Sequence, residues 1–168
     1  MERRKPNRLE GYDYSTAGAY FITICTRDRA NILWEVVPVG AHSVSPSLTF
    51  AGKIVEWAIQ GIEEHYTGVK VDHFVIMPNH IHLLLRLEAP GRTLCAPTDA
   101  QQEGQGGASP NIPRIVKQMK ETVTKRLGRS IFQKSYHDHI IRNQEDYLIR
   151  WNYIDTNPAR WAEDEYYG

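Results

Sequence analysis

The sequence contains few cysteines and no long apolar segment. Its two cysteines, Cys25 and Cys95, are far apart and form no CxxC pair, which excludes the disulfide framework of a small secreted domain. No apolar stretch approaches the roughly 20 residues that a membrane span requires, and the N-terminal MERRKPNR lacks the apolar segment of a signal peptide. We therefore expect free thiols, no membrane association and a cytoplasmic protein.

An excess of charge of one sign is also missing. Twenty Lys and Arg residues balance twenty Asp and Glu residues, so the isoelectric point does not indicate a nucleic-acid-binding protein as a value above about 9 would. The basic residues nevertheless fall mainly in two groups: Arg3, Arg4, Lys5 and Arg8, and then Arg114, Lys117, Lys120, Lys125, Arg126 and Arg129. Two interpretations of these groups stay open, a solvated surface or contact with phosphates.

The length and the hydrophobic content of 41% fit a single domain over residues 1–168. The apolar, β-branched segment 19–26 predicts a first strand. Residues 27–46 are predicted to form a connection, which can include a short strand at 32–39. Apolar residues at helical spacing in 49–66 predict a first long helix that stops before Gly68.

Two further strands are predicted at 69–77 and 80–87. The Pro78-Asn79 pair between them is typical of a tight turn, so these strands should form an antiparallel hairpin. The glycines and prolines of 88–111 predict a flexible loop. An apolar stripe in 113–128 predicts a second long helix, with lysines and arginines on its other side.

The C-terminal part predicts a fourth strand within 130–142 and a last helix. This helix should begin after Asn143, a good N-cap residue, and end near Asn157, because Pro158 disfavours helical geometry in the residue before it. The order strand, helix, hairpin, helix, strand predicts an α+β fold. We expect a ferredoxin-like sandwich, an antiparallel sheet with helices on one face, plus a C-terminal helix.

His80 and His82 are two residues apart on a predicted strand. Residues at this spacing point to the same face, about 7 Å apart, which suits two ligands of one metal ion. A bare HxH is weak evidence, because hydrogen-bonded or surface histidines are the commoner use of this residue. Two histidines also exclude a closed structural zinc site, since the cysteines are badly placed to complete one.

The surroundings of this pair resemble a known family. The segment Met77-Pro-Asn-His-Ile-His-Leu-Leu-Leu85 is similar to the HUH signature (histidine, bulky hydrophobe, histidine) of the single-tyrosine transposases, in particular the REP-associated tyrosine transposases and their IS200-like relatives. Further blocks in the family's order are Tyr12-Asp-Tyr-Ser15, Gly18 to Thr26, Gln133 to Arg142 and Tyr153-Ile-Asp-Thr-Asn-Pro158. Together these blocks cover most of the chain.

The resemblance implies the reaction and its residues. It implies a metal-dependent single-strand DNA endonuclease and strand transferase that acts near hairpins through a 5′-phosphotyrosine intermediate, with Mg²⁺ or Mn²⁺ as cofactor. Tyr153 is the first candidate for the nucleophile and Tyr136 the second. Tyr153 and Asn157 are four residues apart on one predicted helix, so Asn157 can supply a third ligand beside His80 and His82. Relatives often carry glutamine there, and the alternative role of Asn157 is to cap the helix.

The resemblance also implies partners. Single-stranded or hairpin DNA would be bound by Arg150, whose alternative is an ion pair with Asp146, and by the two basic groups, of which we single out Arg3, Arg4, Lys5, Arg114, Lys117, Lys120 and Lys125. No GxxxxGK[ST] loop is present, in keeping with strand joining that needs no ATP. We expect a cytoplasmic, nucleoid-associated monomer or homodimer.

Two other functions stay open from the sequence. One is a catalytically silent module that binds hairpin DNA or RNA. The other is a zinc hydrolase that combines His80 and His82 with a carboxylate such as Asp72 or Glu88, although no HExxH motif supports it.

Overall fold

The computed structural model describes residues 9–38, 44–89 and 110–163. The first half contains β1 (Gly18–Cys25), the 3-10 helix η1 (Arg27–Arg29), β2 (Trp34–Pro38), β3 (Val44–Leu48), α1 (Phe50–Gln60) and α2 (Ile62–His65). The second half contains β4 (Val69–Ile76), β5 (His80–Leu87), α3 (Ile112–Leu127), β6 (His137–Ile141), α4 (Gln144–Thr156) and the 3-10 helix η2 (Asn157–Glu163).

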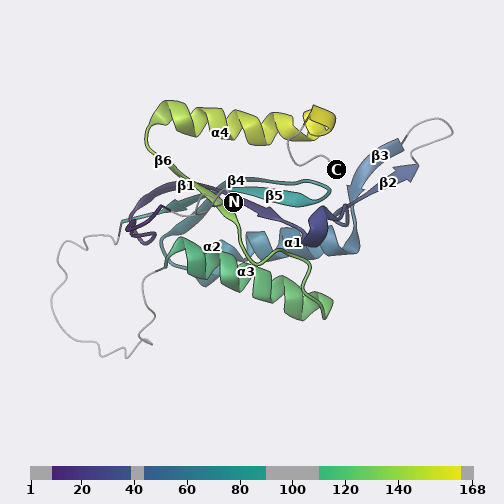
Figure 1. The fold of residues 1–168 in the computed structure, drawn as a ribbon, viewed down its shortest axis with the longest axis horizontal. Coiled ribbons are helices and arrows are strands. Elements are labelled where there is room, and N and C mark those ends of the chain that lie inside the picture. The colour runs from purple at the N-terminus through teal and green to yellow at the C-terminus, as the bar shows by residue number, and fades with distance from the viewer. Residues whose placement is uncertain (1–8, 39–43, 90–109, 164–168) are drawn as a thin grey trace, which may run out of the picture.

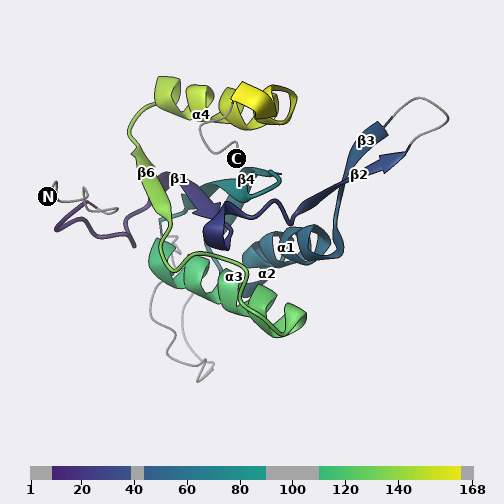
Figure 2. The same cartoon turned by 45° about the vertical axis from the view of Figure 1, so that its right-hand side comes forward.

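Four strands form one antiparallel sheet in the order β4-β5-β1-β6. Helices α1, α2 and α3 lie on one face of this sheet, and α4 lies on the other (Figure 1). The α+β, ferredoxin-like sandwich expected from the sequence is therefore confirmed, and the C-terminal helix covers the face that the other helices leave open. Strands β2 and β3 pair with each other and project from the body of the molecule (Figure 2).

The alternation of side chains along β5 decides which residues face α4. Ile81, Leu83 and Leu85 belong to the larger hydrophobic core, which α1 and α3 cover. His82 pairs in register with Thr23 of β1, and Leu84 joins a smaller cluster with Ile154 of α4. Because successive strand residues point to opposite faces, β5 anchors the sheet with every second residue and presents its histidines to α4.

Side-chain caps and a C-terminal glycine define the long helices. Thr49, Asn111 and Asn143 each accept a hydrogen bond from a backbone N–H in the first turn of α1, α3 and α4 respectively. Gly128 ends α3 in the left-handed conformation, with φ of 70°. The N-cap predicted at Asn143 is confirmed.

The structure differs from the sequence prediction at two places. The helix predicted over 49–66 is split at Gly61 into α1 and α2. The short strand predicted at 32–39 is present as β2 and has a partner, β3, that was not predicted. The last α-helix ends at Thr156 with Asn157 as its C-cap, which confirms the predicted end near Asn157. The chain then tightens into the 3-10 helix η2, and Asn157 itself keeps helical angles (φ −57°, ψ −45°).

Two further predictions can be compared only with the described residues. Most of the predicted loop 88–111 lies outside the described residues. Among the helices that the structure describes, none has the length and apolar character needed to cross a membrane.

Candidate active site

His80 and His82 lie side by side in the interior, beneath the C-terminal elements. Their side chains are buried, and their Nε2 atoms are 3.0 Å apart. Two nitrogens that bind one ion at about 2.1 Å and at right angles would also lie about 3.0 Å apart. The same separation suits a hydrogen bond in which one Nε2–H donates to the other ring. The two Nε2 atoms thus lie close enough for one ion to contact both.

Neighbouring polar groups orient both rings through their Nδ1 atoms. Asn79 Nδ2 donates to the Arg29 carbonyl, which leaves Asn79 Oδ1 to face His80 Nδ1 at 2.9 Å. Since an amide oxygen only accepts, His80 Nδ1 carries the proton and its Nε2 keeps a lone pair. Thr23 Oγ1 lies 2.9 Å from His82 Nδ1. Groups of this kind fix the orientation of metal-binding histidines.

The loop that supports Asn79 has an unusual backbone. Asp28 and Arg29 have φ of 56° and 53°, in the left-handed region that non-glycine residues seldom occupy. The Asn79 carbonyl accepts hydrogen bonds from the backbone N–H and the hydroxyl of Thr26. This tight contact between the end of β1 and the β4–β5 turn holds Asn79, and through it His80, in place.

The electrostatic environment keeps His82 neutral. Burial, the adjacent His80 and the charge of Arg150 together hold the pKa of the His82 imidazole well below its ordinary value. A neutral imidazole is the form that binds metals.

Helix α4 brings Tyr153 to the histidine pair within one chain. The Tyr153 ring meets the His82 ring edge to face, with 5.1 Å between centroids, and contacts Phe21 at 5.9 Å. Phe21 in turn stacks on His82, 5.1 Å away. Trp161 of η2 lies 5.8 Å from His80. The C-terminal elements therefore form the cover of the site as well as carrying its tyrosine.

Asn157 follows Tyr153 by one helical turn and is chemically unusual. Its side chain is 3% exposed, and neither Oδ1 nor Nδ2 has a hydrogen-bond partner among the described residues. A buried amide without partners costs folding free energy, and a bound ion is one of the few features that compensate for this cost. Asn157 also caps the helix, the alternative role predicted for it, but it does so with its backbone N–H, which donates to the Tyr153 carbonyl. The side chain remains available as an oxygen donor, which fits a metal held by two histidines.

Arg150 lies between its predicted ion-pair partner and the site. Its Nε is 3.4 Å from Asp146 Oδ1, and Asp146 Oδ2 is 2.7 Å from His139 Nε2. The Arg150 guanidinium also lies over the Phe21 ring, 5.3 Å from its centroid. The predicted ion pair is therefore present, and it holds the cation beside the histidines.

The other candidates lie elsewhere. Tyr136, the second choice for the nucleophile, is buried in the larger core on the α3 side of the sheet. The candidates Arg114, Lys117, Lys120 and Lys125 are on α3, so the sheet separates them from the histidines. Arg3, Arg4 and Lys5 lie outside the described residues.

No cluster of three or more His, Cys, Asp or Glu side chains suited to a metal occurs in the described ranges. Asp72 and Glu88, the two carboxylates considered for a zinc hydrolase, instead contact Arg86 near the other end of β5. Asp72 accepts hydrogen bonds from Arg86, and Glu88 lies 3.8 Å from the same guanidinium. Among the described residues, the third ligand predicted from the sequence is therefore an amide oxygen, that of Asn157, rather than a carboxylate.

Comparisons with known proteins show a relative and a shared fold. No family model matches the sequence. An uncharacterized protein of Haemophilus influenzae is 32% identical over 175 residues, a match that covers 99% of this chain and 94% of that protein. The chain belongs to the same family as this protein.

A solved structure shares the fold of this chain. A REP-associated tyrosine transposase bound to a REP hairpin superimposes with a TM-score of 0.62 and 20% identity, covering 92% of this chain and 74% of that one. The fold expected from the sequence motifs is therefore confirmed.

Sequence reasoning missed four residues around the site, namely Phe21, Thr23, Asn79 and Trp161. One signal for Thr23 was present, since it is a polar residue inside the apolar run of β1 and the alternation places it on the same face as Phe21. A buried hydroxyl in a strand needs a partner, and here the partner is His82.

Proposed function

We propose that this chain cleaves and rejoins single-stranded DNA next to hairpins, with Tyr153 as the nucleophile and a Mg²⁺ or Mn²⁺ ion held by His80, His82 and Asn157. The observation that carries the proposal is the contact of the Tyr153 ring with His82, four residues before a buried amide that has no partner among the described residues. The shared fold of a transposase that binds a REP hairpin supports DNA as the substrate.

The ligand set indicates which ion to test first. Two imidazole nitrogens suit transition metals better than Mg²⁺, whereas an amide oxygen suits both, so Mn²⁺ is the more sensitive probe. When bound, the ion would polarise the scissile phosphate and offset the negative charge that develops on its oxygens.

The chemical step balances without an energy source. Tyr153 Oη forms a bond to phosphorus and loses its proton to solvent, while the bond from phosphorus to O3′ breaks and O3′ leaves as a hydroxyl. The 5′ end stays attached to the protein as a phosphotyrosine ester. A 3′-hydroxyl of another strand then reverses the step and releases Tyr153, so that strands are joined without ATP.

Arg150 is proposed to bind a phosphate of the substrate. It reaches the site from the same helix as Tyr153, three residues earlier, and the Asp146 carboxylate orients its guanidinium. Because Arg150 is partly buried, its attraction for a phosphate is less screened than that of a surface cation.

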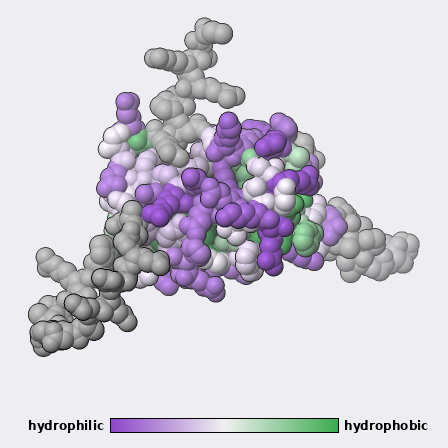
Figure 3. All heavy atoms as spheres, turned by 90° about the horizontal axis from the view of Figure 1, so that it is seen from below, coloured by the Kyte–Doolittle hydropathy of each residue, from purple (hydrophilic) through white to green (hydrophobic). Residues whose placement is uncertain are grey.

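The second proposed DNA contact is a basic groove on the face opposite to the histidines. A groove of about 920 Å³ runs between α3 and residues 130–136. Its basic lining residues are Arg27, Lys117, Lys120, Lys125 and Lys134. Lys120 donates to the carbonyls of residues 133–135 and so holds one wall, whereas Lys117 and Lys125 are exposed. Hydrophilic side chains dominate this side of the molecule (Figure 3), which suits contact with a phosphate backbone.

A denaturing gel tests the proposal directly. Protein mixed with a hairpin-bearing oligonucleotide and Mn²⁺ should form a covalent adduct, and EDTA should abolish it. Tyr153→Phe should form no adduct, whereas Tyr136→Phe, the matched control, should keep it. The double variant His80→Ala/His82→Ala should lose cleavage while it still binds the hairpin.

Three outcomes would contradict the assignment. An adduct that persists in Tyr153→Phe and disappears in Tyr136→Phe would reverse the choice of nucleophile. Cleavage by the double histidine variant would remove the metal site. Tight hairpin binding by the wild type without an adduct in any divalent metal would identify the catalytically silent binding module instead.

A further inference from the structure

Helix α4 buries few apolar residues completely against the sheet that it covers, although Tyr147, Trp151 and Tyr153 pack there half-buried. Among its 13 residues, all of them described, only Ile154 is buried, and the cluster beneath it contains just two further buried residues, Phe21 and Leu84. Amphipathic helices in proteins are normally held by a continuous apolar face. Because only one residue of α4 is fully buried, we expect polar contacts to contribute to holding α4 at one position on the sheet, together with its half-buried aromatic residues.

A β-bulge in the edge strand β4 supplies such contacts. Val71 pairs with Leu85 and His73 pairs with the adjacent Leu84, so Asp72 is an extra residue in the ladder. In a regular strand, neighbouring residues point to opposite faces. Here the bulge turns both Asp72 and His73 toward α4, while Val71 keeps its place against the larger core.

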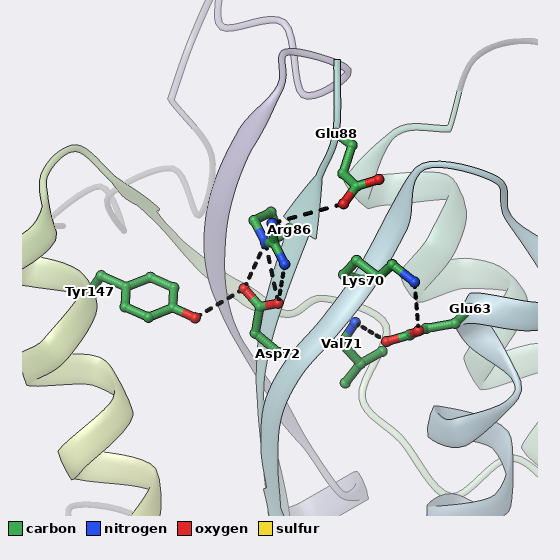
Figure 4. Close-up of polar contacts among 7 residues, drawn as sticks. All are labelled: Glu63, Lys70, Val71, Asp72, Arg86, Glu88 and Tyr147. Carbon is green, nitrogen blue, oxygen red and sulfur yellow. Dashed lines mark hydrogen bonds and ion pairs between the residues drawn. The ribbon is translucent and has the colours of Figure 1, made fainter. Parts of the chain in front are cut away.

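Asp72 makes the first contact. Its carboxylate is 10% exposed and accepts two hydrogen bonds of 3.0 Å from Arg86, and the Tyr147 hydroxyl of α4 donates to Oδ2, also at 3.0 Å (Figure 4). The two-point contact with the guanidinium fixes the carboxylate plane. Tyr147 therefore meets an acceptor whose position is already determined.

His73 makes the second contact one helical turn further along. Its ring stacks on Trp151, with 4.4 Å between centroids, and its Nε2 lies 2.6 Å from Asp155 Oδ1. Tyr147, Trp151 and Asp155 follow one another at four-residue spacing and so share one side of the helix. Two adjacent strand residues thus hold α4 over two turns, and Tyr153 lies between the last two contact points.

We propose that this bulge clasp, defined as Asp72 and His73 with Tyr147, Trp151 and Asp155, positions the tyrosine helix for reaction. The inference rests on the proposed function, because it assigns Asp72 and His73 as positioning residues for Tyr153 and Asn157. Neither residue lies against the histidine pair, so they act through the placement of α4.

Deletion of Asp72 is the most specific test. Removal of the extra residue leaves Val71 opposite Leu85 and His73 opposite Leu84, so the remaining register and the core-facing residues are unchanged. Tyr147→Phe is a milder variant that keeps the chain length and removes only the hydroxyl. Glu63→Gln is the matched control. Glu63 of α2 forms an ion pair with Lys70 of β4, the strand that carries Asp72, and the contacts drawn in Figure 4 do not join Glu63 to α4.

Two measurements on the full chain separate positioning from general stability. Hydrogen exchange of α4 amides should accelerate at least tenfold in both clasp variants, while the amides of β5 keep their protection. At saturating oligonucleotide and Mn²⁺, the rate of adduct formation should fall at least tenfold, while the hairpin Kd changes much less, since α4 supplies only one proposed phosphate contact, Arg150. Glu63→Gln should behave as wild type in both assays.

The outcomes distinguish the two proposals. Wild-type exchange of α4 in Tyr147→Phe and in the deletion variant would overturn the clasp. Equal acceleration in β5 and α4 would also overturn it, because the residues would then support the whole fold. Loss of α4 protection alone in both variants, together with an inactive wild type, would support the clasp and refute the proposed reaction.

Discussion

Asn157 offers the sharpest prediction, because its amide is costly to the fold unless it binds something. We expect Asn157→Leu to make the protein more stable in EDTA, although substitutions at buried positions usually destabilise. The side chain is 3% exposed and both its polar atoms lack a partner among the described residues. An unsatisfied buried polar group costs about 1–3 kcal/mol, and leucine branches at the same carbon without polar atoms.

The expected gain is large enough to measure by thermal unfolding. A stabilisation of about 2 kcal/mol raises Tm by about 4–8 °C in a protein of this size. Asn152→Leu is the control, since Asn152 is exposed on the preceding turn and reports the change in helix propensity alone. Circular dichroism in EDTA and then in MnCl₂ compares the variants. Mn²⁺ should raise the Tm of the wild type by mass action and should leave Asn157→Leu nearly unchanged.

The refuting result is equally clear. If Asn157→Leu lowers Tm in EDTA by several degrees relative to Asn152→Leu, then the amide makes stabilising contacts of its own. It would then not be reserved for a ligand, and the proposed third metal ligand would be wrong.

Three further predictions concern the surroundings of the site. Thr23→Val removes the hydroxyl 2.9 Å from His82 Nδ1; we expect a 10- to 100-fold loss of Mn²⁺ affinity in calorimetric titration, and an unchanged affinity would show that Thr23 does not orient the ring. Burial alone would raise the pKa of the Asp146 carboxyl, but the hydrogen bond and charge of His139 and the charge of Arg150 lower it. The ionised Asp146 carboxylate therefore stabilises the fold above its unfolded pKa of about 3.9, and this contribution is lost as pH falls through the lower folded pKa. The free energy of unfolding that Asp146→Asn loses relative to wild type, measured with urea, should shrink between pH 7 and pH 3. A loss that stays constant over this range would contradict the argument. Lys125→Gln in the basic groove should reduce the slope of log K against log salt by about 0.9 for one lost phosphate contact; hairpin titrations from 50 to 200 mM salt measure it, and an unaltered slope would place the DNA elsewhere.

The sheet and its histidines are predictable because their signals are local. The alternation through β5 and the Pro78-Asn79 turn predict the hairpin and place both histidines on one face of the sheet. The N-cap at Asn143 and the glycine after α3 locate helix ends by the chemistry of single residues.

The parts that escape prediction depend on contacts between distant segments. Nothing near Asp72 marks it as a bulge, because the bulge is defined by its pairing with β5 and by the partners it meets on α4. Gly61 interrupts a helix whose apolar spacing continues past it. The separation of the α3 lysines from the histidines is likewise invisible, since the sequence does not tell which face of the sheet each helix covers.

The location of Tyr153 and Asn157 on one lightly held helix has a thermodynamic consequence. If the amide of Asn157 binds the ion, then an ion at the histidines and the seated helix stabilise each other, and linkage makes the effect reciprocal. If detachment of α4 from the sheet lowers the metal affinity by some factor, then metal binding must shift the equilibrium between attached and detached α4 by the same factor. The protein would then place Tyr153 in its reactive position only when the ion is bound. A metal-free molecule could therefore bind a DNA strand without cleaving it.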